Sequence, residues 1–463
     1  MIYAGFLKKH LEKIKTFIDQ NSIEDETLSS LVFEYDEIDF SSILNNIKSK
    51  KESYFFTKQV SESTTFLGFD SILQIKTFGQ SRLEDTEKII SQLEKKFLSN
   101  WNEFDLESFP LFLGGMTFTI NNSDKLWEDF CDSEWFVPKF LFFESHGKSY
   151  FLYNFLGKNF SEEKITTDFQ ILNSLLIKNN SNSKEIGKIA ISSNGKEKKI
   201  WVENVNKALA EIDSGEVQKI VLSRQVDLDL VNFINISNVL ETLGERYPKC
   251  YVFAFRKNDS IFFGASPEKL ARISDGWIEA DALAGSISRG LTKEGDILLA
   301  NTLLASEKDL AEQEIVVSFI RDSFSQFCSE IVSKSDPVIR KLPNIQHLWT
   351  PIRGKINSNQ SIFAILKALH PTPAICGVPW DKALKSIKEM EPHNRGLFSG
   401  MIGWFNLNYE GEFAVAIRSA LLKEKKIYAF AGCGIVKGSD PEIEYAESEL
   451  KLKPIISLFD NKK

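Results

Sequence analysis

The chain has 463 residues, of which 43% are hydrophobic and 26% are charged, and its formal net charge is -8. This composition is sufficient for a large core, and a mildly acidic chain without a long basic stripe is not typical of a nucleic-acid-binding protein. The five cysteines stand singly, which indicates reduced thiols rather than a disulfide framework. No apolar run approaches the length of a membrane span, and charge begins by Lys8, too early for a secretory segment. We therefore expect a cytoplasmic enzyme or binding protein that uses neither nucleic acid nor membrane.

The chain up to about residue 178 is rich in Phe, Lys and Ser. The stretches "YFFTKQV" and "TTFLGFDSILQIKTF" are aromatic and β-branched and predict strands, and "FPLFLGGMTFTI" predicts two strand pieces around Gly114-Gly115. The polar stretch from Leu175 to Ile189 is the best loop candidate. We expect it to connect an N-terminal part, residues 1–195, to a C-terminal part, residues 196–463, or to be a loop within one integrated fold.

The signals become sharper from Trp201 onward. "IWVENVNKALAEIDSGEVQ" predicts a helix that ends near Gly215, and "KIVLSRQVDLDL" predicts a strand. "CYVFAFRKNDSIFFGASPEKLARI" predicts two strands around a turn at Asn258-Asp259. Further strands are expected in "GWIEADALAGSISRG", "LWTPIRGKI", "FSGMIGWFNLN", "GEFAVAIRSALL" and "KIYAFAGCGIV".

Two long helices complete the pattern. One is predicted from about Thr292 to Phe327, and the last begins in "SDPEIEYAESELK", with Asp440 as N-cap and Pro441 at the first helical position. Strands mixed with long helices, without regular alternation, predict an α+β fold.

Both helices carry acidic side chains along one face. Glu312 shares a face with three apolar residues of "SEKDLAEQEIVVSFI", and Asp309 lies one turn earlier. In the last helix Glu444 and Glu447 share a face with Lys451. Two such pairs can build an oxygen-rich site for Mg²⁺, and no His or Cys cluster favours a softer metal. The alternative is a solvated acidic face, which is the more common situation for helices taken alone.

Nine short blocks follow one another between Trp201 and Ile456, and their order and spacing are specific although each alone is weak. They are "KIVLSRQ", "FGASPEKL", "ALAGSISRG", "SEKDLAEQ", "IQHL", "HPTPAICGVP", "NRGLFSGMIGW", "FAVAIRSA" and "AGCGIVKGSDPEIEYAESELK". In these blocks the sequence resembles the chorismate-utilising enzymes, the family of isochorismate, salicylate, anthranilate and aminodeoxychorismate synthases, and within it the isochorismate synthases. The first part of the chain matches more loosely, through "FLGFD" and "GGMTF". The resemblance implies an antiparallel β-sheet core flanked by helices, with the active site in the C-terminal part.

The resemblance implies that water adds to C2 of chorismate while the C4 hydroxyl leaves. Lys219 matches the general base and Glu268 the general acid; a lysine acts as a base only without its proton, and a glutamate as an acid only with it. Glu312 and Glu447 match direct Mg²⁺ ligands, and Asp309 and Glu444 match positions that reach the ion directly or through water. Read without the family, Lys219 is a strand-end lysine in solvent and Glu268 a residue of a Ser-capped helix start.

Other matching positions hold the two substrate carboxylates. Arg418 and Lys451 match carboxylate-binding residues, since a guanidinium in an apolar strand needs an anionic partner. Backbone amides near Gly285-Ser286 and Gly432 match sites of close ligand approach, although turn geometry alone also accounts for such glycines. His347 matches a site histidine; by itself, "IQHLW" is more typical of a core histidine.

Two residues depart from the family pattern: Gln313 stands where many members have His, and Phe398 where Tyr is common. Lys219 indicates water rather than ammonia as nucleophile, and Ala284 replaces the nucleophilic lysine of aminodeoxychorismate synthases. We expect a Mg²⁺-dependent isochorismate synthase that feeds menaquinone or siderophore biosynthesis, with chorismate as its small-molecule partner and no amidotransferase subunit, as a monomer or homodimer. Salicylate synthase and a non-catalytic protein of the same fold remain the alternatives.

Overall fold

The computed structural model describes residues 2–21, 23–47, 53–104, 109–120, 124–157, 161–178, 185–191, 196–358 and 360–459. Its α-helices are α1 (Ile2–Gln20), α2 (Phe40–Asn46), α3 (Arg82–Glu94), α4 (Glu162–Leu175), α5 (Lys196–Asp213), α6 (Ile236–Arg246), α7 (Lys293–Leu304), α8 (Glu307–Ser325), α9 (Ile362–Leu369), α10 (Trp380–Met390) and α11 (Pro441–Ile456). Short 3₁₀ helices are η1 (Val60–Glu62), η2 (Trp101–Glu103) and η3 (Lys125–Trp127).

The strands of the first part are β1 (Leu28–Tyr35), β2 (Tyr54–Gln59), β3 (Thr64–Thr77), β4 (Phe97–Ser99), β5 (Phe112–Met116), β6 (Ser133–Ser145), β7 (Lys148–Leu156) and β8 (Ile189–Ile191). Those of the second part are β9 (Lys219–Leu230), β10 (Tyr251–Lys257), β11 (Ser260–Ser266), β12 (Lys269–Ser274), β13 (Trp277–Ser288), β14 (Cys328–Ser333), β15 (Val338–Lys341), β16 (Ile345–Ile356), β17 (Gly377–Val378), β18 (Met401–Phe405), β19 (Gly411–Val415), β20 (Ser419–Lys423) and β21 (Lys426–Val436).

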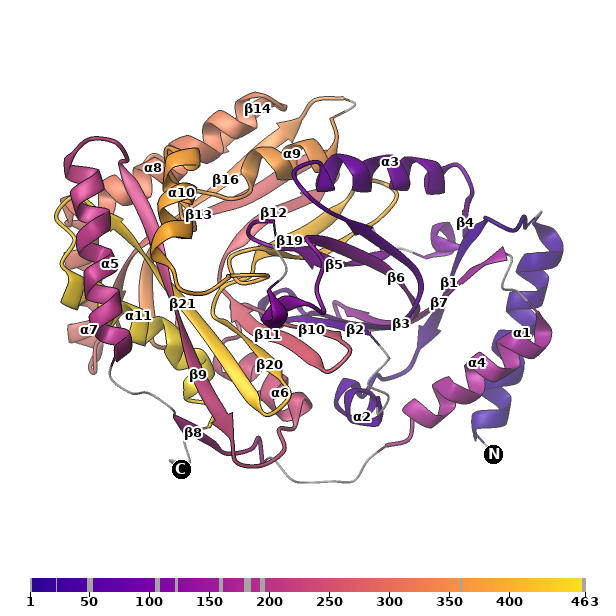
Figure 1. Cartoon of the computed structure of the whole chain (residues 1–463). Helices are drawn as coiled ribbons and strands as arrows, with labels where there is room; N and C mark the ends of the chain where they lie inside the picture. The colour runs from indigo at the N-terminus through magenta and orange to yellow at the C-terminus, as the bar shows by residue number, and fades with distance from the viewer. Residues whose placement is uncertain are drawn as a thin grey trace.

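Within the described ranges, the strands form one continuous sheet in which only the β1–β4 pair is parallel. Strand β6 pairs with β3, β5 and β7, and two arms leave this centre. One arm runs from β3 through β2, β10, β11, β20 and β21 to β9. The other runs from β5 through β18, β19, β12 and β13 to β16. Because β2 pairs with β10 and β5 with β18, the sheet passes through both parts of the chain (Figure 1). The division near residue 195 stays a prediction.

The aromatic richness of the first part follows from burial of both sheet faces. Along β6, Leu141 and Phe143 enter one hydrophobic core, whereas Phe140 and Phe142 enter a second core on the opposite face. Successive side chains of a strand alternate between faces, so a sheet covered on both sides needs an uninterrupted apolar run such as "FLFF", residues 140–143. The predicted α+β class is confirmed. No helix in the described ranges is long and apolar enough to cross a lipid bilayer.

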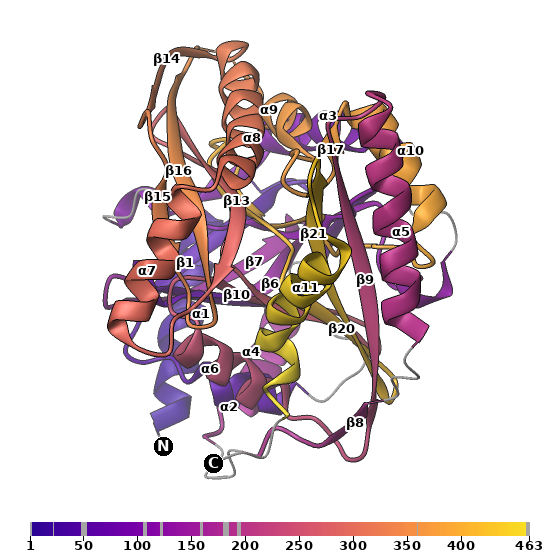
Figure 2. The same ribbon diagram turned by 90° about the vertical axis from the view of Figure 1, so that its left-hand side faces the viewer.

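The helices α8 and α11 lie where the two arms of the sheet approach each other (Figure 2). Helix α8 packs along β13 and also contacts β21, whereas α11 packs along β21 and also contacts β13. The start of α11 follows the predicted signal, since the Asp440 side chain accepts hydrogen bonds from the backbone N–H groups of Glu442 and Ile443. The packing of α8 and α11 against β13 and β21 brings the two acidic helices to one end of the sheet.

Three predicted elements are wrong in detail. The single helix expected from Thr292 to Phe327 is two helices, because the Ser306 hydroxyl caps a new helix by accepting from Asp309 N. "GEFAVAIRSALL" is two strands, β19 and β20, separated at Arg418, whose φ is +52°.

The third is "FPLFLGGMTFTI", which forms one strand, β5, through both glycines. A side chain at Gly114 would place its Cβ 2.0 Å from Glu134 O of β6, so the glycine permits close strand pairing rather than a turn. Within the predicted loop from Leu175 to Ile189, α4 ends at Leu175 and β8 begins at Ile189, and residues 179–184 lie outside the described residues.

Candidate active site

One cavity between α8, α11 and the ends of the two sheet arms collects most of the predicted site residues. Its lining includes nine of the twelve: Glu268, Gly285, Ser286, Glu312, His347, Arg418, Gly432, Glu447 and Lys451. Lys219 lies directly behind the lining, in contact with Glu312, whereas Asp309 and Glu444 do not line the cavity. The roles assigned to these residues stay predictions.

Lys219 begins β9 and is fully buried. Its Nζ lies 2.8 Å from Glu312 Oε1 of α8, and no described acceptor meets it in hydrogen-bonding geometry. Burial acts to raise the pKa of Glu312, but the charges of Lys219, then Lys451 and Lys308, outweigh it and hold that pKa below its usual value. Because the Lys219 side chain is fully buried, the alternative of a lysine with its amine in solvent is wrong.

Gly434 of β21 makes this pairing possible. A Cβ there would lie 2.3 Å from Glu312 Oε1 and 2.7 Å from Lys219 Cε. Only a residue without a side chain allows the lysine and the carboxylate to meet against the β21 backbone.

Glu268 lies between β11 and β12, and β12 follows it directly, so the helix-start alternative for "SPEKL" is wrong. Its backbone N–H donates to Ser266 Oγ at 3.3 Å, and its carbonyl accepts from Val415 N at 3.1 Å. Burial raises the pKa of its carboxyl to about 8, although the nearby cations Arg418, Lys219 and Lys451 act in the opposite direction. The side chain is therefore mainly protonated at neutral pH and able to donate.

Arg418 enters the cavity from the break between β19 and β20. Its Nη2 lies 3.3 Å from His347 Nε2, and His347 Nδ1 lies 2.9 Å from Ser286 Oγ and 3.2 Å from Gly285 O. Burial, and next the charge of Arg418, lower the pKa of His347 well below its ordinary value. A neutral imidazole with its proton on Nδ1 donates toward Gly285 O and accepts from Arg418, which orients the guanidinium.

Arg418 is buried and forms no ion pair with any carboxylate of the described residues. A buried guanidinium without an anionic partner is unfavourable, so the cavity presents an unused site for an anion. On the other side of the cavity, Lys451 Nζ donates to Gly432 O at 3.0 Å and pairs with Glu447 Oε1 at 2.6 Å.

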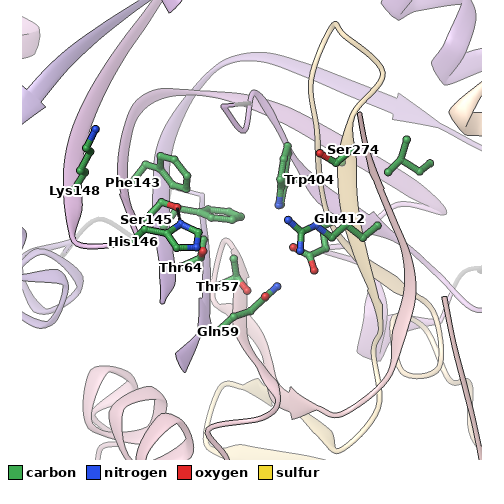
Figure 3. A pocket seen from close by; sticks show the side chains of 14 residues that line it. Thr57, Gln59, Thr64, Phe143, Ser145, His146, Lys148, Ser274, Trp404 and Glu412 are labelled. Atoms are coloured by element: carbon green, nitrogen blue, oxygen red, sulfur yellow. Dashed lines mark hydrogen bonds between the residues drawn. The ribbon is translucent and has the colours of Figure 1, made fainter. Parts of the chain in front are cut away.

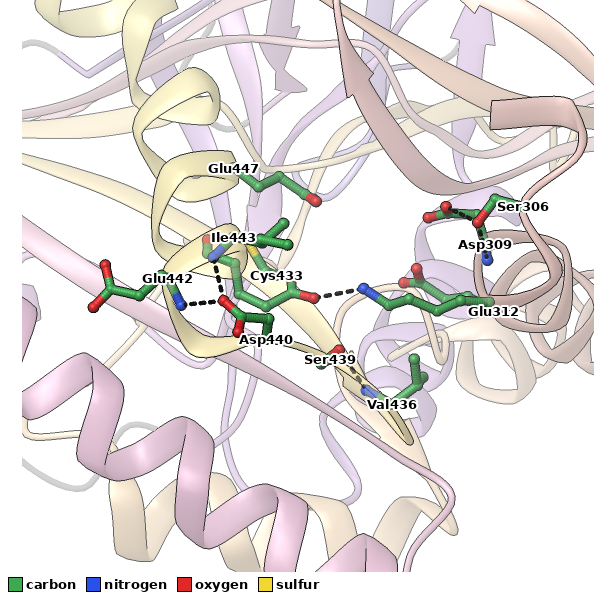
Figure 4. Close-up of polar contacts among 12 residues, drawn as sticks. Ser306, Asp309, Glu312, Cys433, Val436, Ser439, Asp440, Glu442, Ile443 and Glu447 are labelled. Atoms are coloured by element: carbon green, nitrogen blue, oxygen red, sulfur yellow. Dashed lines mark hydrogen bonds and ion pairs between the residues drawn. The ribbon is translucent and has the colours of Figure 1, made fainter. Parts of the chain in front are cut away.

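The acidic residues approach from two helices, each with its own lysine. Lys308 Nζ of α8 pairs with Glu444 Oε1 of α11 at 2.6 Å, and Ser306 Oγ donates to Asp309 Oδ2 at 2.5 Å. Figure 4 shows Glu447 on one side of a gap, with Asp309 and Glu312 on the other. The four carboxylates expected around Mg²⁺ therefore face a common region without meeting at one point.

The donors suit a hard divalent cation. Ligand atoms of Glu444, Glu447 and Cys433 lie within 4.8 Å of one another. Burial, and next repulsion from Glu447, raise the pKa of Glu444, and a cation held between the two side chains would offset that repulsion. Burial also raises the pKa of the Cys433 thiol, whose Sγ donates to Glu444 O at 3.3 Å, so carboxylate oxygens are the available ligands.

Sequence reasoning missed the parts played by Lys308 and Cys433. Lys308 stands four residues before Glu312 on a helix, a spacing that signals a possible pair, but in the fold it pairs across to Glu444. No local signal places Cys433, which lies on the β21 face turned toward α11.

Gln313 fixes α8 against the sheet. Its Oε1 accepts from Ala284 N at 2.8 Å, and its Nε2 donates to Ala282 O at 3.0 Å and to Thr350 Oγ1 at 3.1 Å. The register of β13 against β16 shifts between Ala284 and Ser286. The Gln313 side chain accepts the hydrogen bond of the Ala284 backbone N–H at this shift. Gln313, which stands where many family members have His, thus holds in place the helix that carries Glu312. Phe398 stacks on Phe430, with ring centroids 5.2 Å apart.

The space between the lining side chains is about 50 Å³, whereas small-molecule sites typically offer roughly 300–1,000 Å³. A ring-sized ligand therefore requires side chains such as the Lys451–Glu447 pair to move. A larger cavity, about 370 Å³, lies elsewhere, between β2, β3 and the β6–β7 turn on one side and β12, β18 and β19 on the other (Figure 3). It contains none of the predicted site residues.

Comparisons with known proteins agree with these observations. A family model described as "Chorismate binding enzyme" matches residues 10–460. Isochorismate synthase MenF of Bacillus subtilis is 32% identical over 416 residues, which cover 84% of this chain and 86% of that protein. The salicylate biosynthesis isochorismate synthase of Pseudomonas aeruginosa is 38% identical over 260 residues, 56% of this chain and 54% of that protein.

A solved structure, that of the menaquinone-specific isochorismate synthase MenF of Escherichia coli, matches with a TM-score of 0.80. It covers 98% of this chain and 100% of its own at 22% identity, a level at which the likeness establishes the fold.

Proposed function

The chain belongs to the chorismate-binding enzyme family, and from this premise we propose that it is an isochorismate synthase, which converts chorismate to isochorismate. One observation carries the proposal: two ionisable side chains are buried at the same cavity. Lys219 is fully buried directly behind its lining, and Glu268, in the lining, is mainly protonated at neutral pH. A base and an acid are the two groups that adding water at one carbon and removing hydroxyl at another require.

In the proposed reaction, Lys219 takes a proton from water as its oxygen attacks C2 of the ring. The ring double bond shifts, the C4–O bond breaks, and Glu268 gives its proton to the departing hydroxyl, which leaves as water. One water enters and one leaves, so substrate and product are isomers. Arg418, held by His347, and Lys451 bind the carboxylates of chorismate.

Mg²⁺ fits this proposal, since the available donors are carboxylate oxygens, which hard divalent cations prefer. Glu312 and Glu447 would hold the ion, with Asp309 and Glu444 one turn away, and it would supply positive charge toward the substrate carboxylate. Because Glu312 pairs with Lys219 and Glu447 with Lys451, each ligand must exchange its lysine partner for the ion.

The proposal also covers the pathway, the cellular location and the assembly of the chain. The Escherichia coli MenF is described as menaquinone-specific and the Pseudomonas aeruginosa relative is named for salicylate biosynthesis. We propose a role in menaquinone or siderophore biosynthesis for this chain. The five cysteines carry no disulfide, which supports a reducing, cytoplasmic location. We propose action without an amidotransferase subunit, as a monomer or homodimer.

Incubation of the protein with chorismate and Mg²⁺, followed by chromatography of the products, tests the function. We expect isochorismate without equimolar salicylate and pyruvate, loss of activity in EDTA and recovery on adding Mg²⁺. Salicylate with pyruvate would establish the salicylate synthase alternative, and binding without turnover would establish the non-catalytic one. Full activity in EDTA would contradict the metal proposal. The matched variant is Glu447→Gln, whose activity should no longer respond to added Mg²⁺.

A further inference from the structure

A second cavity, about 460 Å³ in volume, lies on the far side of the segment that walls the active site. It is enclosed by the start of α3, the end of β5, α9 and α10, and Figure 1 shows α3 beside α9 above the first-part strands. Its volume falls within the range of small-molecule sites, roughly 300–1,000 Å³. None of the predicted catalytic residues lines it.

The cavity combines an apolar interior with positive charge. Its apolar lining consists of Leu83, Met116, Phe118, Ile120, Phe319, Pro371, Trp380 and Leu384. Arg82, Lys367 and Lys388 also line it, and no described lining residue is acidic. Lys367 is paired with Glu84 outside the cavity, which leaves Arg82 and Lys388 as the cations available to a ligand.

His370 provides an independent indication of a ligand. It lines the cavity and is only 8% exposed; among the described residues neither ring nitrogen has a partner in full hydrogen-bonding geometry, although the backbone of Phe118 lies close enough to act on the ring and raise its pKa. Burial, and next the charge of Arg82, lower its pKa to about 3, so the imidazole is neutral and offers one N–H donor. Unpaired buried donors are rare unless a ligand or water completes them.

Arg82 also retains free donors. Its Nη2 donates to Thr117 O at 3.1 Å, the single hydrogen bond of the guanidinium among the described residues, and burial lowers its pKa, while the nearby carboxylate of Asp132, outside the cavity lining, acts in the opposite direction. A guanidinium, a neutral imidazole N–H and an ammonium around an apolar chamber match a carboxylate on an apolar body. We propose that this cavity is a binding site for a small molecule that carries one carboxylate on an apolar body, for which 2-naphthoate is a suitable probe, and that its occupancy is coupled to the active site.

The coupling follows from the chain between the two cavities. His370 and Trp380 line the second cavity, whereas Ala374 and Ile375 between them line the catalytic one. The same segment forms β17, in which Val378 pairs with Lys219 of β9. A ligand that moves residues 370–380 therefore changes the wall and the support of the catalytic cavity; this second part of the proposal rests on the proposed function.

Isothermal titration calorimetry of the full-length protein with 2-naphthoate tests the site without any turnover. We expect saturable binding that Arg82→Gln weakens at least tenfold and Lys388→Gln several-fold. Lys385→Gln, on the same helix but outside the lining, is the matched control and should leave the affinity unchanged. Uncharged 2-naphthamide should bind at least tenfold more weakly. If Arg82→Gln does not fold, the exposed Lys388 variant and the amide comparison still decide the question.

Several results would overturn the proposal: no binding at millimolar 2-naphthoate, equal binding of the amide, or equal effects of the Lys388 and Lys385 variants. Binding that survives both Arg82→Gln and Lys388→Gln but is displaced by chorismate would assign the carboxylate to the catalytic cavity instead. For the coupling, saturating 2-naphthoate should change kcat or KM for chorismate in the parent protein but not in Arg82→Gln. Unchanged kinetics would refute the coupling and leave the binding result standing.

Discussion

Replacing Glu268 with Gln separates catalysis from stability in one variant. Gln keeps the size and hydrogen-bonding shape of the protonated carboxyl but cannot give up a proton. We therefore expect Glu268→Gln to lose turnover of chorismate. Because it also removes the burial of an ionisable group, we expect the variant to be more stable than the parent in alkaline solution.

The magnitude follows from the pKa of Glu268, about 8 in the folded protein against 4.5 as the ordinary value. At about 1.4 kcal/mol for each pH unit between them, the difference corresponds to roughly 5 kcal/mol. Between pH 4.5 and about 8 the folded protein holds a proton that the unfolded chain has lost. The free energy of unfolding therefore falls as pH rises through this window and becomes flat above it, as far as this group is concerned.

Urea unfolding at about pH 5, 6.5 and 9, followed by circular dichroism, measures the effect. The stability of Glu268→Gln relative to the parent should rise with pH, by up to about 5 kcal/mol overall. Glu279→Gln is the matched control with the opposite sign. Burial acts to raise the pKa of Glu279, but its hydrogen bond with Lys269 prevails and holds it below the ordinary value.

A stability difference between Glu268→Gln and the parent that does not vary with pH would refute the reasoning. It would mean that Glu268 is already ionised at neutral pH and has no proton to give. Full turnover by Glu268→Gln would remove it from the mechanism even if the pH dependence of stability were as expected.

Further substitutions test the neighbouring residues. Lys219→Met should abolish turnover while Mg²⁺ binding, followed by calorimetry, is largely retained; undiminished turnover would exclude Lys219 as the base. Gln313→Met unpairs three buried groups at about 1 kcal/mol each, so unfolding in urea should show a loss of about 3 kcal/mol together with reduced turnover. An unchanged unfolding midpoint would show that α8 does not depend on this amide. Gly434→Ala should remove activity with the circular dichroism spectrum intact, since its Cβ would lie 2.3 Å from Glu312 Oε1. Gly295→Ala, whose Cβ would lie 3.4 Å from the nearest atom, should be tolerated, and equal activity of both variants would contradict the steric argument.

The local elements were largely predictable because their signals lie within a few residues of one another. Strand β9 occupies the whole of "KIVLSRQVDLDL", and the Asp440 side chain caps α11 as its position before Pro441 indicates. Hydrophobic periodicity also placed Glu312 on the inward face of α8. The same periodicity treated Asp309 as equivalent, yet only Glu312 lines the cavity.

The break at Arg418 shows where local reasoning ends. "GEFAVAIRSALL" alternates like one strand, but the chain adopts a positive φ at Arg418 and turns its guanidinium into the cavity. Nothing in the surrounding residues signals this conformation, and His347, which contacts the guanidinium, is distant in sequence.

The amino-acid sequence by itself determined the strands, the capped helices and the family, because patterning, capping and ordered motifs are properties of neighbouring residues. Tertiary structure alone decided that Lys308 pairs with Glu444, which is 136 positions away, and that Gln313 completes a bulge in β13. It also decided that Glu268 keeps its proton. Desolvation and ion pairing depend on every element packed around a group, and such surroundings exist only once the chain has folded.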